Sequence, residues 1–212
     1  ITLLLTFGNS SKEDFIMTQQ REKTRSLVEM ALFMAIIVVL AVTPLGYIPL
    51  GFMNATTIHI PVIIAGIVLG WKKGVFCGFV FGLTSFINAT FRSASVLSFL
   101  FTPFKPFGNG WSLVIAFVPR ILIGVVAFFV FKALFNVTKK KSISMFLAGV
   151  AGSMTNTILL MGMAYLFFAE PYAEKTNIAV EGVLKAVATV MVVNGIPEAV
   201  IAGIIASAVC AA

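Results

Sequence analysis

Long apolar stretches joined by short polar connections run along most of the chain. Residues 56–88 show the pattern most clearly, because two apolar stretches flank a four-residue turn that carries Lys72 and Lys73. A soluble protein could not bury both stretches, whereas a bilayer covers them and leaves the lysines among the headgroups. The stretches lack the alternation of transmembrane β-strands, so we predict an all-α membrane protein with six transmembrane helices. The predicted helices are Leu27–Thr43, Ile58–Trp71, Gly74–Phe91, Trp111–Phe135, Ser144–Phe168 and Leu184–Val209.

The second predicted helix is short for a membrane span. Its fourteen residues, 58–71, reach about 21 Å at 1.5 Å per residue, whereas the hydrocarbon core is about 30 Å thick. Irregular backbone at membrane depth is tolerated where it is buried in protein or lines a cavity. The loop 44–57 is therefore predicted to dip inward and wall an outward-facing ligand pocket. A tilted helix or a locally thinned bilayer is the alternative explanation.

Composition and charge agree with this pattern and indicate an orientation. Hydrophobic residues make up 59% and charged residues 11% of the chain, with a mean hydropathy of +1.05, whereas soluble domains carry about 25% charged residues. The net charge of +7 fits basic cytoplasmic loops better than a nucleic acid partner, which is not expected. Basic residues gather before the first helix and in the connections that follow the second and fourth helices. Both termini are therefore predicted to be cytoplasmic, with loops 44–57, 92–110 and 169–183 facing outward.

The N-terminal region is expected to lie outside the membrane domain. Residues 1–26 are predicted to form a cytoplasmic N-terminal segment, and residues 27–212 a single six-helix membrane domain. Residues 1–16 look like an upstream extension, since Met17 opens a more typical polar N-terminus. The run ITLLLTF is too short to span and no small-residue cleavage site follows it, so no secretory signal is predicted.

Four polar residues are predicted to lie at mid-membrane depth, where each is costly and indicates function or pairing. Arg120 belongs to the fourth predicted helix and Glu198 to the sixth. Asn194 lies one turn from Glu198 on the same helix face, and Asn156 lies midway along the fifth helix. Two interpretations stay open. Arg120 and Glu198 form a structural ion pair that locks two helices together, or this polar cluster is the floor of a ligand site.

Small residues recur at four-residue spacing in two helices. The third carries Gly74, Gly78 and Gly82, and the first carries Ala31 and Ala35. Such spacing lets helix backbones approach closely within lipid. The glycine stripe is expected to pack the bundle, while the alternative for any such stripe is a docking surface for a separate membrane subunit.

Motifs for metal binding and catalysis are absent from the sequence. His59 has no Cys, Asp or Glu at ligand spacing, and Cys77 and Cys210 lie in apolar stretches, so we expect no metal site, no cofactor and plain thiols. No GxxxxGK[ST], HExxH or GxSxG motif occurs, and buried charges are few. The chain therefore reads as a membrane-embedded binding subunit that needs a partner for energy, not as an enzyme. The competing hypotheses are an intramembrane enzyme using Glu198 or His59, and a stand-alone channel or scaffold.

Three stretches together indicate a family: TTIHIPVIIAGIVLGWKKGVFCGFVFGLTSFIN, VPRILIGVVAF (Val118–Phe128) and VNGIPEAVIAGII (Val193–Ile205). The chain resembles the substrate-binding (S) components of energy-coupling-factor (ECF) vitamin transporters over 27–208, most of all the pantothenate-specific branch. The resemblance implies six helices with both termini inside, in the cell membrane of a prokaryote. It implies a vitamin pocket near the outer face, and toppling of the subunit to carry the vitamin inward. Hydroxymethylpyrimidine, riboflavin or folate is the alternative vitamin.

The resemblance also implies partners and candidate ligand contacts. Ala31 and Ala35 match a motif that contacts a transmembrane coupling subunit, and two cytoplasmic ATPase subunits would use the ATP. Pantothenate is an anion, so a cation is expected in its pocket. The outer loop 91–111 is rich in phenylalanine and carries Lys105, which fits either an interfacial aromatic belt or a lid over an acidic ligand. The candidate substrate-binding residues are Arg92, Arg120 and Asn194, followed by Tyr47, Phe52, Asn88, Trp111 and Asn156.

Overall fold

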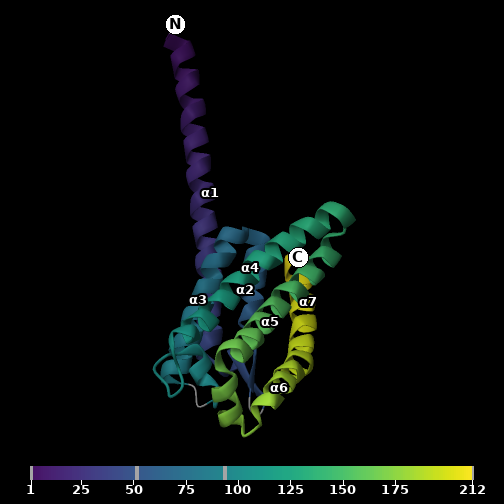
Figure 1. The fold of residues 1–212 in the computed structure, drawn as a ribbon. Coiled ribbons are helices and arrows are strands. Elements are labelled where there is room, and N and C mark those ends of the chain that lie inside the picture. The colour runs from purple at the N-terminus through teal and green to yellow at the C-terminus, as the bar shows by residue number, and fades with distance from the viewer. Residues whose placement is uncertain (1, 51–52, 93–94, 212) are drawn as a thin grey trace.

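The computed structural model describes residues 2–50, 53–92 and 95–211, with side chains described for 17–46, 56–92 and 95–210. Its helices form one bundle, from which the first part of α1 extends alone (Figure 1). The described chain is helical apart from one short hairpin and its connecting turns. The helices and strands are α1 (Thr2–Val42), β1 (Tyr47–Leu50), β2 (Met53–Thr56), α2 (His59–Leu69), α3 (Trp71–Phe91), α4 (Gly110–Thr138), α5 (Lys141–Thr176), α6 (Val183–Val190) and α7 (Ile196–Ala211).

Five helical stretches of the described chain are long and apolar enough to cross a membrane. The second predicted span corresponds to α2, whose 11 residues reach only about 16 Å and cannot cross a core of about 30 Å alone. Each predicted helix is found, but α2 is shorter than predicted and α5 is longer. The five stretches are Met17–Val42, Trp71–Phe91, Gly110–Thr138, Lys141–Thr176 and Val180–Cys210.

The loop before α2 is an ordered hairpin. β1 pairs with β2 in antiparallel register, with Tyr47 opposite Thr56. At its base the Thr57 amide donates to the Gly46 carbonyl at 3.3 Å, and the Thr57 hydroxyl donates to the Leu45 carbonyl at 2.6 Å. Strand pairing gives the backbone groups of the two strands hydrogen-bond partners within the protein. The segment before the short α2 therefore has regular secondary structure, in the form of this hairpin.

The predicted four-residue turn after the second helix is wrong in length. α2 and α3 are separated by Gly70 alone, which has φ 92°, a conformation that costs glycine little. Lys72 and Lys73 consequently lie in the first turn of α3. A single glycine is sufficient to end one helix and start the next, so both lysines are helical.

α1 is one uninterrupted helix of 41 residues. Residues 2–26 therefore belong to the same helix as the first predicted span. Within its polar stretch, Arg25 Nε donates to Glu29 Oε1 at 2.9 Å, one turn further on. Lys73 Nζ donates to Ser26 Oγ and connects α1 to the start of α3.

The last predicted helix is interrupted by a π turn, η4 (Met191–Gly195), between α6 and α7. Pro197 follows at the second position of α7, and a proline has no N–H to donate to the preceding turn. A wider π turn is the usual local response to a disturbed helical ladder and often occurs at functional sites. Asn194 lies inside this turn.

Glycines bring α3 into backbone contact with α4. A Cβ at Gly78 would lie 2.3 Å from the Arg120 carbonyl oxygen, and one at Gly74 would lie 3.1 Å from Gly124 Cα. Gly82 similarly faces the Ala116 carbonyl oxygen at 2.9 Å. The prediction that the glycine stripe packs the bundle is confirmed.

α2 lies at the centre of the molecule (Figure 1). Every residue from His59 to Ile67 is buried, and the helix contacts α1, α3, α4, α5 and α7. A short helix that is apolar on all sides is typical of such a central position. The longer helices therefore surround α2.

Candidate ligand-binding site

A cavity of about 890 Å³, its open mouth included, lies within the bundle. Its walls come from β2, α3, η2 (Ser98–Phe101) with the residues before it, α4, α5, α6, η4 and α7. The lining residues are Thr56, Ser85, Asn88, Ala89, Ser95, Leu97, Ser98, Leu100, Phe101, Arg120, Asn156, Thr157, Leu160, Met161, Val190, Asn194, Gly195 and Glu198.

Arg120 provides the positive charge of this cavity and is only 3% exposed. The preceding Pro119 has no N–H, so the Ile115 carbonyl loses its usual helical donor. Arg120 Nη1 donates to that carbonyl at 2.6 Å. Its guanidinium lies 4.7 Å from the ring centre of Phe101 and 5.6 Å from that of Phe81, which is within cation–π range. The Pro-Arg pair and two aromatic rings thus hold a cation at membrane depth.

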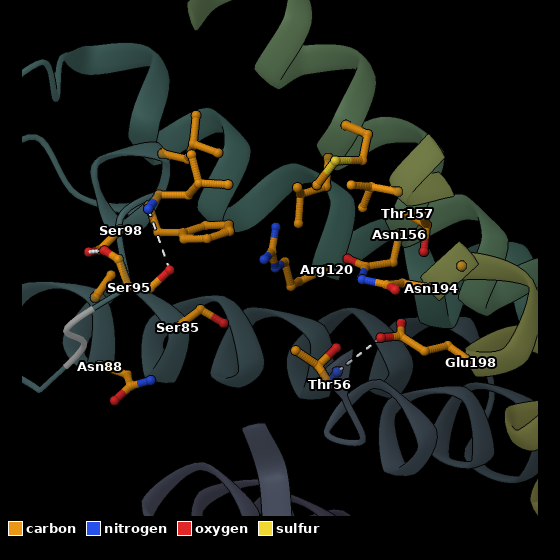
Figure 2. Close-up of a pocket in the computed structure, with 18 residues that line it drawn as sticks. Thr56, Ser85, Asn88, Ser95, Ser98, Arg120, Asn156, Thr157, Asn194 and Glu198 are labelled. Atoms are coloured by element: carbon orange, nitrogen blue, oxygen red, sulfur yellow. Dashed lines mark hydrogen bonds between the residues drawn. The ribbon is translucent and has the colours of Figure 1, made fainter. Parts of the chain in front are cut away.

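A group of amides and one acid forms one side of the cavity. Figure 2 shows Asn156, Asn194 and Glu198 close together, with Arg120 between them and the opposite side. Glu198 Oε1 accepts a hydrogen bond of 3.2 Å from the Thr56 amide, which joins residues 142 positions apart. This contact connects the end of the hairpin to α7. The loop before α2 thus contributes Thr56 to the cavity wall, as the short second helix predicted.

Small hydroxyl side chains form the opposite side. Figure 2 shows Ser85, Asn88, Ser95 and Ser98 there, contributed by α3 and by the segment that leads into η2. Ser98 Oγ donates to the Ser95 carbonyl and receives a hydrogen bond of 3.1 Å from Lys105 Nζ. The lysine of the phenylalanine-rich loop therefore supports this wall directly.

Arg120 and Glu198 share the cavity but do not touch. Among the described residues, the structure has no ion pair between them within 4.0 Å. Glu198 instead accepts from a backbone amide, and Arg120 donates to a backbone carbonyl. The predicted structural ion pair is not formed in this structure because each side chain has its own backbone partner.

Four of the eight candidate substrate-binding residues line the cavity: Asn88, Arg120, Asn156 and Asn194. The other four have different positions or are not described. Arg92 is exposed and donates to the Val42 carbonyl at 3.2 Å. Trp111, half exposed at the start of α4, stacks on Phe167 with ring centres 4.1 Å apart. Tyr47 belongs to β1, with its side chain outside the described residues, and Phe52 lies outside them entirely.

Several lining residues were not predicted, and the sequence carries a signal for some of them. Ser85 lies three residues before Asn88 on α3, so the two share a helix face. Thr157 is adjacent to Asn156 and donates to the Ser153 carbonyl at 3.4 Å. Serine and threonine hydroxyls often donate a hydrogen bond to a carbonyl of their own helix in this way. Their presence in an apolar span therefore does not indicate a ligand site.

Two further predictions concern partners and metals. Ala31 and Ala35 are both exposed on α1, which leaves their faces open to a neighbouring helix. Among the described residues no group of three or more His, Cys, Asp or Glu side chains is placed to hold a metal ion. Cys77 is buried and Cys210 half-buried, and both are free thiols.

Comparisons with known proteins identify the family. The model of the family described as "ECF transporter, substrate-specific component" matches residues 25–210. "Pantothenic acid transporter PanT" of Lactococcus lactis subsp. cremoris is 40% identical over 156 residues, which cover 70% of this chain and 76% of that protein. "Pantothenate transporter PanT" of Leuconostoc mesenteroides subsp. mesenteroides is 39% identical over 109 residues, or 49% of each chain. These matches confirm the resemblance found in the sequence, and the chain belongs to the family of substrate-specific components of ECF transporters.

Proposed function

We propose that this chain captures pantothenate in the membrane as the substrate-binding subunit of an ECF importer. The observation that carries the proposal is the cavity, which combines the buried cation Arg120 with amides, hydroxyls and an apolar wall. Two relatives named as pantothenate transporters support the choice of vitamin. Hydroxymethylpyrimidine, riboflavin and folate remain the alternatives within the same role.

The chemistry of pantothenate matches the cavity group by group. Its carboxylate pairs with the guanidinium of Arg120, the side chain best suited to a planar anion. Its amide and two hydroxyls can pair with the polar side chains of the walls, which include amides and one acid. Its branched dimethyl carbon fits the apolar part of the lining, which includes Leu160, Met161 and Val190. Neutral hydroxymethylpyrimidine has no carboxylate to offer the guanidinium of Arg120.

The membrane arrangement we propose has six crossing helices with both termini cytoplasmic, in the multi-pass fold of a prokaryotic cell membrane protein. The five long stretches cross alone, and α2 completes its crossing together with the hairpin. Lys72, Lys73, Lys139, Lys140 and Lys141 then lie on the cytoplasmic side, and the hairpin and η2 face outward. The cavity, bounded by the hairpin and by residues 95–101, opens toward the outside in this orientation.

Energy would come from partner subunits. A transmembrane coupling subunit would contact the exposed Ala31 and Ala35, and two cytoplasmic ATPase subunits would hydrolyse ATP, so that this chain topples and releases its vitamin inside. Ala31→Trp or Ala35→Trp should block co-purification with the coupling subunit and uptake, because a large ring prevents close helix approach. Ile36→Trp, an exposed apolar position on another face of α1, is the matched control. Full uptake by both alanine variants would contradict this interface.

Binding of labelled pantothenate to the purified protein tests the proposed substrate. We expect saturable binding that excess hydroxymethylpyrimidine, riboflavin and folate do not displace. Arg120→Gln should weaken binding by about tenfold or more, the cost of a lost charge-assisted contact. Tight binding of one of the three competitors without binding of pantothenate would overturn the choice of vitamin.

An intramembrane enzyme is a weaker explanation of the same cavity. Glu198 is the one acid among the described lining residues, and His59 does not line the cavity. Cys77, the buried thiol, does not line it either. Hydrolytic or acyl-transfer chemistry needs a nucleophile beside a base, and the described lining offers no such pair.

A further inference from the structure

Asn156 lines the cavity with an amide oxygen that has no hydrogen-bond partner among the described residues. Its side chain is 6% exposed, and its Oδ1 is buried. A buried polar atom without a partner costs about 1–3 kcal/mol, so native proteins seldom keep one. The cavity that Asn156 lines is the place from which a partner can reach it.

Two more polar groups lie beside this amide. Figure 2 shows Asn194 and Glu198 next to Asn156, on the side of Arg120 that is away from the serines. Glu198 Oε1 already accepts from Thr56, and the structure gives no further hydrogen bond to Glu198 from the described residues. This amide–acid end, defined as Asn156, Asn194 and Glu198, is therefore rich in acceptors, whereas Arg120 has donors only.

We infer that the cavity orients its ligand: Arg120 binds the carboxylate, and the amide–acid end binds the hydroxyl groups. This inference rests on the proposed function, because it takes pantothenate as the ligand. Pantothenate carries its carboxylate at one end and its two hydroxyls at the other, which matches two chemically different ends of one cavity. Leu160, Met161 and Val190 line the cavity as well and supply apolar contact for the dimethyl carbon beside the hydroxyls.

Hydroxyls suit the amide–acid end better than any charged group. A hydroxyl has one donor and can also accept. One hydroxyl can therefore donate to the Asn156 amide oxygen while the other donates to the Glu198 carboxylate, and both can accept from the amide nitrogens. A second anion would lie beside the acid in surroundings of low dielectric, where like charges repel strongly. The cavity should therefore reject a ligand whose hydroxyl is esterified with phosphate. A chain selective for the free vitamin follows from this placement.

Ligand analogues combined with matched variants test the orientation. Pantothenol has an alcohol in place of the carboxylate, and a second analogue has hydrogen in place of both hydroxyls. The purified wild-type protein should prefer pantothenate over each analogue by about tenfold or more, since each analogue leaves buried polar groups unpaired. Asn156→Leu should lose the preference over the hydroxyl-free analogue and keep the preference over pantothenol. Arg120→Gln should show the reverse.

Asn136→Leu is the matched control, because it removes the same amide from an exposed position of α4 that does not line the cavity. It should keep the wild-type preference for the hydroxyls. Asn194→Leu supplies a second variant at the amide–acid end and should weaken that preference as Asn156→Leu does. A wild-type preference for hydroxyls in both Asn156→Leu and Asn194→Leu would overturn the orientation while leaving pantothenate as the ligand. A wild-type protein that binds no pantothenate would instead overturn the proposed function.

Discussion

Gly78 holds α3 against the part of α4 that carries Arg120. A Cβ added at Gly78 would lie 2.3 Å from the Arg120 carbonyl oxygen and 2.8 Å from Ile121 Cα, distances below the 3.0 Å that real Cβ atoms respect. Both neighbours are backbone atoms, which cannot rotate away as the end of a side chain can. Gly78→Ala should therefore push the two helices apart by about 1 Å, until the contact reaches the ordinary range near 3.4 Å.

The size of the effect follows from two opposing terms. Overpacking a close contact costs about 1–3 kcal/mol, whereas alanine in a helix interior is about 0.5–1 kcal/mol better than glycine. The net loss lies between about 0 and 2.5 kcal/mol. A central value of about 1 kcal/mol corresponds to a fall in melting temperature of about 2–4 °C for a chain of this size. Since the displaced atoms belong to Arg120, pantothenate affinity should also fall, by about tenfold or more for a shift near 1 Å.

Thermal melting of the purified protein in detergent, with and without pantothenate, measures both effects. Gly162→Ala is the matched control, because Gly162 lies within α5 and a Cβ there meets no atom within 4 Å. The control should be as stable as the wild type or slightly more stable, with unchanged affinity. The reasoning is refuted if Gly78→Ala has the same melting temperature as this control and binds pantothenate normally. The close contact would then not hold Arg120 in place.

Three further changes test other contacts. Glu198→Ala removes the acceptor of the Thr56 amide, so limited proteolysis should cut the hairpin faster than in the wild type. Glu198→Gln keeps an acceptor and should be cut at the wild-type rate. Equal rates of cutting for the two variants would contradict the contact. His59→Leu replaces a buried imidazole whose backbone contact at Thr56 is weak. It should raise the melting temperature slightly because leucine brings no polar atom into the core, and a large fall would show that the contact with Thr56 stabilises the fold. Gly195→Ala places a Cβ 2.8 Å from Thr157 Cγ2, and melting should show a smaller loss than Gly78→Ala because a side chain can rotate away.

The helices were predictable because most apolar runs are about as long as a helix that crosses the hydrocarbon core. The shortness of the second run also predicted that the preceding loop reaches the cavity, and Thr56 does so. The hairpin itself was not predictable, since its apolar sequence shows no strand alternation. The π turn at Met191–Gly195 was also missed, because Pro197 fits an ordinary helix kink equally well.

The lining of the cavity was most predictable where burying a polar side chain is expensive. Arg120, Asn156 and Asn194 stand out in apolar spans because each needs a reason to be there, and all three line the cavity. Arg92 and Trp111 carried no such constraint, since cations and aromatic rings near a membrane surface are common without a ligand. The separation of Arg120 from Glu198 was not predictable either, because the sequence does not reveal that each would find a backbone partner.

Each end of the cavity is positioned by a different pair of helices. Gly78 lets α3 approach the backbone of Arg120, whereas Gly195 lets η4 approach Thr157 beside Asn156. These contacts share no residue, and substitutions at separate sites without shared partners act independently. Ligand recognition should therefore divide in the same way: damage at the first contact reduces recognition of the carboxylate, and damage at the second reduces recognition of the hydroxyls. Two independent supports explain how a bundle with few polar residues can hold a cation and a group of acceptors apart in one cavity without letting them pair.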